Sequence, residues 1–144
     1  MPEAARAYFR AMRKLVVALS ACFLFLAASC EKENNDQGYR AAGITYRTDS
    51  GYTYMDDTVG VGDTLLIGAM VAEGSERLDR LYVEYAINDG AYQRHDSVDF
   101  AQNPMALDFQ AIMGGTPRTE LWGVLAVERN GNTTRHNLRF TVVE

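Results

Sequence analysis

Cysteine is scarce in this sequence, and its two copies, Cys22 and Cys30, both lie in the first 30 of 144 residues. The later residues therefore cannot form a disulfide among themselves. Small exported domains often rely on disulfides because their hydrophobic cores are small. Here the fold must be stabilised by its core alone.

Histidine is equally scarce, because His95 and His136 are the only two. A catalytic triad or a histidine metal centre has little to draw on, and the sequence contains no nucleophile elbow or phosphate-binding glycine loop. His95 with Asp96 and Asp99 would suit a general base oriented by a carboxylate, but a solvated polar edge is the simpler interpretation. His136 is expected on an inward stripe, capped by a backbone group. We expect no catalytic residue, no cofactor and no enzymatic activity.

Spaced metal-binding acids are also missing. Asp56, Asp57 and Asp63 offer carboxylates to a calcium ion, yet they lack the regular spacing of a calcium loop. Acidic residues beside glycine are ordinary turn residues. We therefore expect no metal site.

Positive charge is limited, since 14 basic residues face 19 acidic ones and the net charge is −5. Removing residues 1–29 takes away four basic residues and one acidic residue, which leaves a net charge of −8. Nucleic acids and anionic lipid headgroups both require clustered cations. Nucleic acid is therefore excluded as an expected partner.

A long hydrophobic run is absent as well. The apolar stretch at residues 15–28 is shorter than the roughly 18–20 residues that a membrane-spanning helix needs. It follows Arg13 and Lys14 and ends in small residues before Cys30, which is typical of a secretory signal with a lipid attachment site. Residues 1–29 are therefore expected to form a helical lipoprotein signal peptide, with Met12 as an alternative start.

Two cysteines compete as the attachment site. Cys22 also follows small residues, but cleavage there would leave the apolar residues 23–26 at the start of the mature chain. Cys30 is followed by a polar stretch that is too poor in apolar residues to fold. We expect lipidation of Cys30 and a flexible tether over residues 30–43.

The segment Ala27-Ala28-Ser29-Cys30-Glu31-Lys32-Glu33 resembles the signal end of Bacteroidota-type lipoproteins. In that family, an acidic stretch after the lipidated cysteine is associated with export to the outer face of the outer membrane. The resemblance implies an outer membrane lipoprotein, exposed at the surface or otherwise facing the periplasm. Ala27 departs from the Leu or Val of the strict motif, and Lys32 interrupts the acidic stretch.

Beyond the tether, apolar residues alternate with period 2 and no helical period recurs. Strands are expected at residues 44–48, 64–72, 81–87, 91–95 with 97–100, 105–111, 121–128 and 134–142, with a broken edge strand between 52 and 63. Asn88-Asp89-Gly90 and Asn130-Gly131-Asn132 predict tight hairpin turns.

This pattern predicts an all-β fold, an immunoglobulin-like antiparallel β-sandwich of about seven strands over residues 44–144. Residues 127–133 resemble the last hairpin of bacterial Ig-like, PKD-like and fibronectin-III-like domains. The cysteine pair of antibody-type domains is absent. The alternative is a small closed barrel of the lipocalin type, which would carry an apolar ligand.

Outward positions on three strands predict a ligand-binding face. If the strands around Tyr82, Trp122 and Asn137 are neighbours, one face carries Arg80, Tyr82, Glu84, Glu120, Trp122, Arg135, Asn137 and Arg139. Aromatic rings bury area and guanidinium groups fix orientation, so the candidate ligand-binding residues are Tyr82, Trp122, Arg80, Arg135 and Arg139. The competing interpretation places Trp122 in the core, because its strand is apolar on both sides.

Three hydroxyl residues, Thr58, Thr64 and Ser97, each lie between an aspartate and an apolar residue. They resemble the acceptor at which Bacteroidota glycosylate exported proteins, which makes them candidate O-glycosylation sites, although so short a pattern is common in β-proteins. Taken together, the sequence predicts a lipid-anchored envelope or surface protein that acts as a non-enzymatic binding, adhesion or assembly accessory module. Its expected partners are the membrane, through the lipid on Cys30, and a glycan or a protein.

Overall fold

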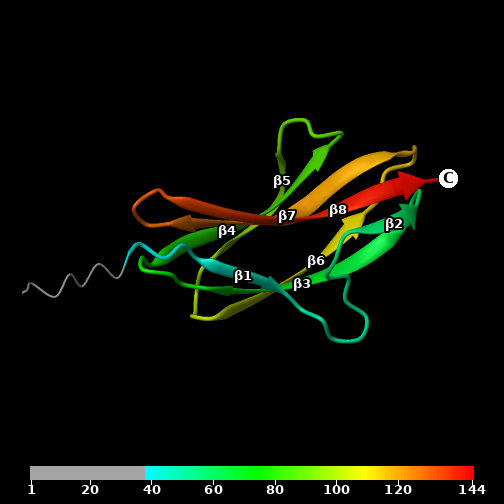
Figure 1. Ribbon diagram of the computed structural model, residues 1–144. Coiled ribbons are helices and arrows are strands. Elements are labelled where there is room, and N and C mark those ends of the chain that lie inside the picture. Colours follow the sequence, from blue (N-terminus) through cyan, green and yellow to red (C-terminus); the bar gives the residue numbers. More distant parts are fainter. Residues whose placement is uncertain (1–37) are drawn as a thin grey trace, which may run out of the picture. The chain divides into compact units, whose positions relative to one another are not determined.

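The computed structural model describes residues 38–144, which form two β-sheets packed face to face (Figure 1). Residues Tyr39–Glu144 make one compact unit. The predicted signal peptide at residues 1–29, the lipidation site Cys30 and tether residues 31–37 lie outside the described residues. Between residues 38 and 144, no helix is long and apolar enough to cross a membrane.

The eight strands divide into sheets of three and five. The three-stranded sheet has the order β1-β3-β6 and consists of β1 (Gly43–Tyr46), β3 (Thr64–Ala72) and β6 (Met105–Ile112). The five-stranded sheet has the order β2-β8-β7-β4-β5 and consists of β2 (Asp57–Gly60), β8 (Thr133–Val143), β7 (Arg118–Glu128), β4 (Leu78–Ile87) and β5 (Gln93–Asp99).

The predicted all-β sandwich is confirmed, with two differences of detail. The expected broken edge strand contains β2, which brings the number of strands to eight, and β2 pairs with β8 in parallel whereas the other pairs are antiparallel. The alternative of a closed barrel is wrong, because the strands form two separate sheets.

The core lies between the sheets and follows the period-2 alternation of the sequence. Leu81 and Val83 on β4, Val124 on β7 and Phe140 on β8 are at most 1% exposed. Ile67 on β3 packs into the same core from the opposite sheet. Because adjacent residues of a strand point to opposite faces, these buried positions define which residues face outward.

The first hairpin turn is shifted by one residue from its expected position. The Asp89-Gly90 pair is the expected centre of a tight hairpin turn, but it is Asn88 and Asp89, with φ angles of 49° and 56°, that adopt the left-handed conformation. Gly131 in the second hairpin has a φ angle of 90°, as its turn requires.

A polar cluster holds the loop after β1 against the outer face of the three-stranded sheet. Arg47 bonds to Asp49 at 2.8 Å and lies 3.3 Å from Asp108, while the Tyr52 hydroxyl donates to Asp108 at 2.8 Å. The cluster requires a glycine at position 68, which lies beneath these side chains. A β-carbon at Gly68 would approach the Tyr52 ring to 2.6 Å and Asp108 to 2.8 Å.

Substitution of Gly68 by alanine is therefore expected to lower the free energy of unfolding by about 1 kcal/mol, because side chains must shift to admit the methyl group. Chemical denaturation measures the change. Gly43→Ala is the matched control, since a β-carbon at Gly43 meets nothing within 4 Å. Equal stability of the two variants would contradict the assigned role of Gly68.

Candidate ligand-binding face

Four of the five candidate ligand-binding residues share the outer face of the five-stranded sheet. Arg80 and Tyr82 alternate with the buried residues of β4, and Arg135 and Arg139 alternate with those of β8. Leu125 on the intervening strand β7 is the register partner of both Tyr82 and Arg135, which places all three in one row across the sheet.

Trp122 points into the core, so its predicted place on this face is wrong. Its side chain is 4% exposed, its ring stacks on Tyr85 with the centroids 4.9 Å apart, and its indole N–H donates to Glu120 at 2.8 Å. Glu120 is likewise buried and inward, not outward as expected. Strand β7 is central in the sheet and apolar on both sides, which is why alternation alone could not assign its direction.

Two stacks of arginine on tyrosine lie on the outer face. The guanidinium carbon of Arg94 lies 4.0 Å from the centroid of the Tyr82 ring, and that of Arg135 lies 4.0 Å from the Tyr92 ring. Sequence reasoning missed Arg94, on the irregular edge strand β5, and Tyr92, in the β4–β5 loop. Asn137 donates to the Tyr92 hydroxyl at 2.6 Å, which holds this loop residue over the sheet.

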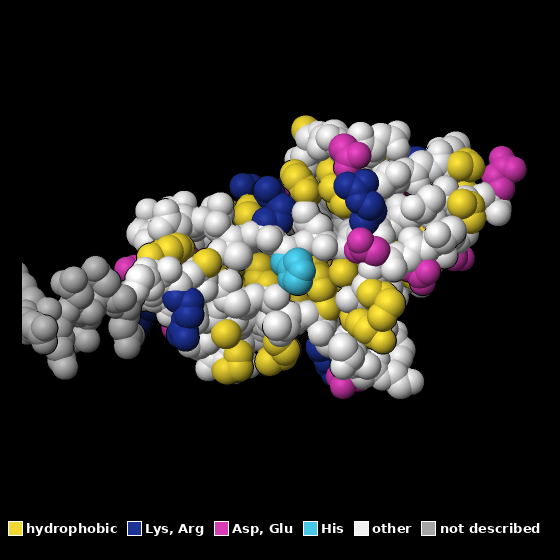
Figure 2. All heavy atoms as spheres, viewed as in Figure 1, with side chains coloured by type: hydrophobic (Ala, Val, Ile, Leu, Met, Phe, Trp, Pro, Cys, Tyr) yellow, Lys and Arg dark blue, Asp and Glu magenta, His cyan; other side chains and the backbone are white. Residues whose placement is uncertain are grey.

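Ion pairs hold most of the arginines of this face in place. Arg135 bonds to the buried carboxylate of Glu84 at 2.9 Å, Arg80 to Asp99 at 2.7 Å, and Arg139 to Asp89 in the first hairpin at 2.8 Å. Figure 2 shows basic and acidic side chains next to one another over this sheet.

Arg94 differs from these three arginines. Among the described residues it makes no ion pair, and its contact is the face of the Tyr82 ring. Its guanidinium donors therefore remain available to a ligand, oriented by the aromatic ring beneath them.

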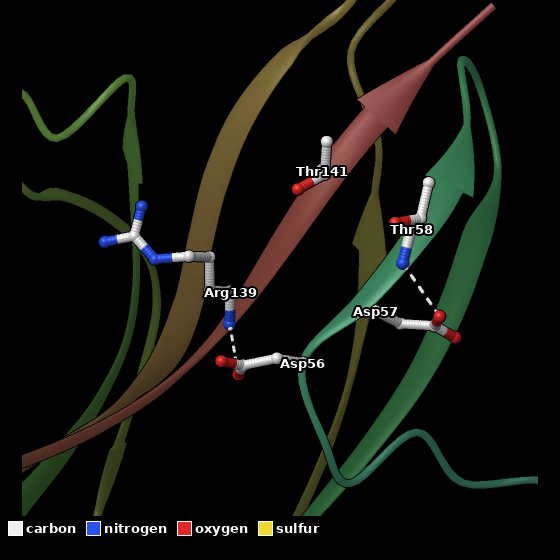
Figure 3. Close-up of a pocket in the computed structure, with 5 residues that line it drawn as sticks. All are labelled: Asp56, Asp57, Thr58, Arg139 and Thr141. Carbon is white, nitrogen blue, oxygen red and sulfur yellow. Dashed lines mark hydrogen bonds between the residues drawn. The ribbon is translucent and has the colours of Figure 1, made fainter.

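A shallow pocket of about 330 Å³ continues the face towards the sheet edge (Figure 3). It is lined by Asp56, Asp57, Thr58, Arg139 and Thr141. Thr58 and Thr141 are register partners of the parallel strands β2 and β8. The Asp56 carboxylate accepts the backbone N–H of Arg139 at 2.8 Å, and the Arg139 side chain extends away from Thr58. Hydroxyl and carboxylate groups thus line one polar recess, beside the stem of Arg139.

Comparison with known protein families and with curated proteins finds no match to this sequence. Among solved structures, one similar chain is the CARDB domain of a Pyrococcus furiosus protein, whose crystal structure was determined in complex with di-metal ions. The two chains are 17% identical with a TM-score of 0.45, and the similarity covers 74% of this chain and 90% of that domain.

The three aspartates considered for calcium bond to backbone amides. Besides the bond from Asp56, Asp57 accepts the N–H of Thr58 at 2.7 Å and Asp63 accepts that of Gly60 at 2.8 Å. In the part of the chain that the structure describes, no group of three His, Cys, Asp or Glu residues is arranged to hold a metal ion. The aspartates act there as turn residues.

The two histidines occupy different surroundings. Nδ1 of His136 lies 3.0 Å from the carbonyl oxygen of Ile44, so the predicted backbone cap is confirmed. His95 is exposed on β5, and its ring stands edge-on against Trp122 at 5.2 Å. Neither neighbouring carboxylate orients it, because Asp96 accepts the N–H of Ser97 and Asp99 pairs with Arg80.

All three candidate O-glycosylation residues are exposed. Thr58 lies on β2, Thr64 begins β3 and Ser97 lies on β5. Exposure is necessary for modification, and the modification itself stays a prediction.

Proposed function

We propose that this protein is a non-enzymatic binding module that holds a glycan on the outer face of the five-stranded sheet. The observation that carries the proposal is the pair of arginine–tyrosine stacks, Arg94 on Tyr82 and Arg135 on Tyr92. Guanidinium groups that an aromatic ring holds in place are preoriented to bind acidic or hydroxyl oxygens, and the ring edges beside them add apolar contact area for a sugar. The recess next to Arg139 supplies further hydroxyl and carboxylate partners.

A glycan suits this face better than nucleic acid does. The described residues contain more acidic than basic side chains, and three of the four arginines of the face are paired with carboxylates. A polyphosphate would meet those carboxylates unfavourably, whereas a sugar uses carboxylates as hydrogen-bond acceptors for its hydroxyl groups.

The binding test is a glycan array followed by titration of the best binder. Tyr82→Ala and Arg94→Ala are each expected to weaken binding about tenfold, because each removes a ring or a charged donor from the ligand. Arg94→Ala leaves no carboxylate without its partner. Arg77→Ala, at an exposed position outside the face, is the control and should bind as the native protein does. Unchanged affinity in both face variants, or an array with no binder, would overturn the proposal.

The second part of the proposal is the location. The domain, of the immunoglobulin-like type, is attached to the outer membrane through a lipid on Cys30 and is displayed at the cell surface; the charged, polar residues after Cys30 support a tether. Protease treatment of intact cells that express the native chain or Cys30→Ala tests this. Surface attachment requires cleavage of the native protein and loss of membrane association in the variant. Unchanged association of the variant would refute lipidation.

A further inference from the structure

Within residues 38–144, each sheet has two edge strands that pair on one side only, β1 and β6 in the three-stranded sheet and β2 and β5 in the five-stranded sheet. Strand β6 is the last of the three-stranded sheet and β5 the last of the five-stranded sheet (Figure 1). A cleft of about 340 Å³ lies between these two edges. Its lining residues come from β3, β5 and β6: Leu66, His95, Asp96, Asp108, Phe109, Gln110 and Ile112.

The cleft runs against the backbone edge of β6. Asp108, Phe109 and Gln110 are consecutive and point alternately outward, inward and outward, with Phe109 buried and its neighbours exposed. A cleft that touches all three cannot lie on one face of the strand, so it lies along its edge. Alternate N–H and C=O groups of an edge strand point away from the sheet and remain free to pair.

Strand β5 is less suited to pairing than β6. The register between β4 and β5 shifts at Val83 and Glu84, and such a bulge disrupts an edge. Its exposed side chains also include Arg94 and Asp96, which are typical of a protected edge. By contrast, β6 pairs with β3 in continuous register over its eight residues.

We propose that the free edge of β6 binds an extended peptide segment of a partner protein, which adds a fourth strand to the three-stranded sheet. This surface is separate from the glycan face. Peptide side chains on one side of the added strand would meet Asp108 and Ile112, and those on the other side would meet Phe109 and Asp96.

The chemistry of the cleft favours a peptide that carries both basic and apolar side chains. Asp96 supplies negative charge, and one oxygen of its carboxylate accepts the N–H of Ser97. Asp108 adds a second carboxylate, which it shares with the Tyr52 hydroxyl and, at 3.3 Å, with Arg47. Ile112 is 60% exposed and Leu66 37%, which provides apolar surface beside these charges. Main-chain bonds would supply affinity and the alternating side chains specificity.

The probe for this site is the capped peptide Thr-Arg-Val-Thr-Val-Arg-Thr, titrated into the protein. We expect saturable binding, with amide chemical shift changes along β6 and a change in the fluorescence of Trp122, the only tryptophan, which contacts His95 of the cleft. N-methylation of the two valines removes backbone donors and should abolish binding. Replacement of both arginines by glutamate should weaken it strongly.

Matched protein variants complete the test. Asp96→Asn should weaken the peptide about threefold, whereas Asp57→Asn should not, although Asp57 makes the same local bond to the next backbone N–H at 2.7 Å. Arg94→Ala, which affects the glycan face, should leave peptide affinity unchanged. Equal binding of the N-methylated peptide would overturn strand addition. Chemical shift changes along β6 that depend on protein concentration alone would also overturn it, because they would assign the edge to a second copy of the chain. Binding of a glycan at β6 in place of the peptide would overturn it as well.

Discussion

Replacement of Glu120 by glutamine is expected to lower the free energy of unfolding at neutral pH by about 2–3 kcal/mol. The Glu120 side chain is 1% exposed, and its two oxygens accept three hydrogen bonds. Oε1 accepts the N–H of Gly114 at 2.8 Å and Nε of Arg118 at 2.7 Å, and Oε2 accepts the indole N–H of Trp122 at 2.8 Å. Glutamine has one acceptor oxygen and an NH₂ group, so at least one of these donors would face another donor.

The destabilisation should depend on pH. Burial alone would raise the pKa of Glu120, but the hydrogen bonds from Trp122, Gly114 and Arg118 outweigh it and hold the pKa below its ordinary value of 4.5. A carboxylate with a depressed pKa in the folded state stabilises the protein above its unfolded pKa and loses that contribution as the pH falls through the folded pKa. The difference between native protein and Glu120→Gln should therefore be constant above pH 4.5 and shrink below it.

Urea denaturation at a series of pH values measures both effects. Glu76→Gln, at an exposed carboxylate, is the control and should change stability by less than about 0.5 kcal/mol. Trp122→Phe keeps a ring and removes the indole donor, so a double-mutant cycle with Glu120→Gln isolates the energy of that bond. A difference that does not vary with pH would mean that folding leaves the pKa of Glu120 unchanged.

The alternation of apolar residues was enough to predict the sandwich and most of its strands, because one face of each strand must enter the core. The pairing of β2 with β8 was missed for a physical reason. A parallel pair between four-residue β2 and the distant C-terminal strand leaves no hairpin signal, and its stability comes from contacts that are far apart in sequence.

Only part of the candidate ligand-binding face could be predicted from the sequence, because alternation fixes the direction of a side chain only where one side of the strand is polar. Arg80 and Tyr82 follow a clear alternation on β4, so their direction could be read from the sequence. The direction of Trp122 could not, because Leu125 on the opposite side of β7 is also buried. Tyr92 belongs to a loop whose position depends on Asn137 of another strand, and no local pattern encodes that contact.

The cleft at β6 depends on topology alone. Which strands end their sheets follows from the order of all eight strands, and a change in that order would cover the same residues. Alternation in residues 105–111 predicted a half-buried strand but contained no information about its free edge. Binding surfaces that are made of backbone edges therefore emerge only with the complete fold.

Substitution of Gly74 by alanine is expected to lower the free energy of unfolding by about 3 kcal/mol, at the upper end of overpacking effects. Gly74 lies in the turn between β3 and β4, where the chain preceding β1 crosses it. A β-carbon at Gly74 would overlap the carbonyl oxygen of Arg40 and lie 2.6 Å from the carbonyl carbon of Ala41. Both neighbours are backbone atoms, so a rotamer change cannot relieve the overlap.

The backbone at Gly74 is also unable to move away freely. Ser75 donates its N–H to the carbonyl oxygen of Arg40 at 2.8 Å, and the N–H of Arg40 donates to the Ser75 hydroxyl at 2.8 Å. Ala42, two residues further, is 5% exposed in the core and leads directly into β1. Moving residues 40–42 away from Gly74 would therefore break the two hydrogen bonds between Arg40 and Ser75 and pull Ala42 out of the core.

Gly115→Ala is the matched control for Gly74→Ala, because a β-carbon at Gly115 meets no atom within 4 Å. Urea denaturation should show a large loss for Gly74→Ala and a change of less than about 0.5 kcal/mol for Gly115→Ala. Hydrogen exchange would locate the damage: amides of β1 and its partner β3 should lose protection before those of β7 and β8, since the substitution acts at the crossing beside β1. Native stability in Gly74→Ala would show that residues 40–42 are not held against this turn in solution.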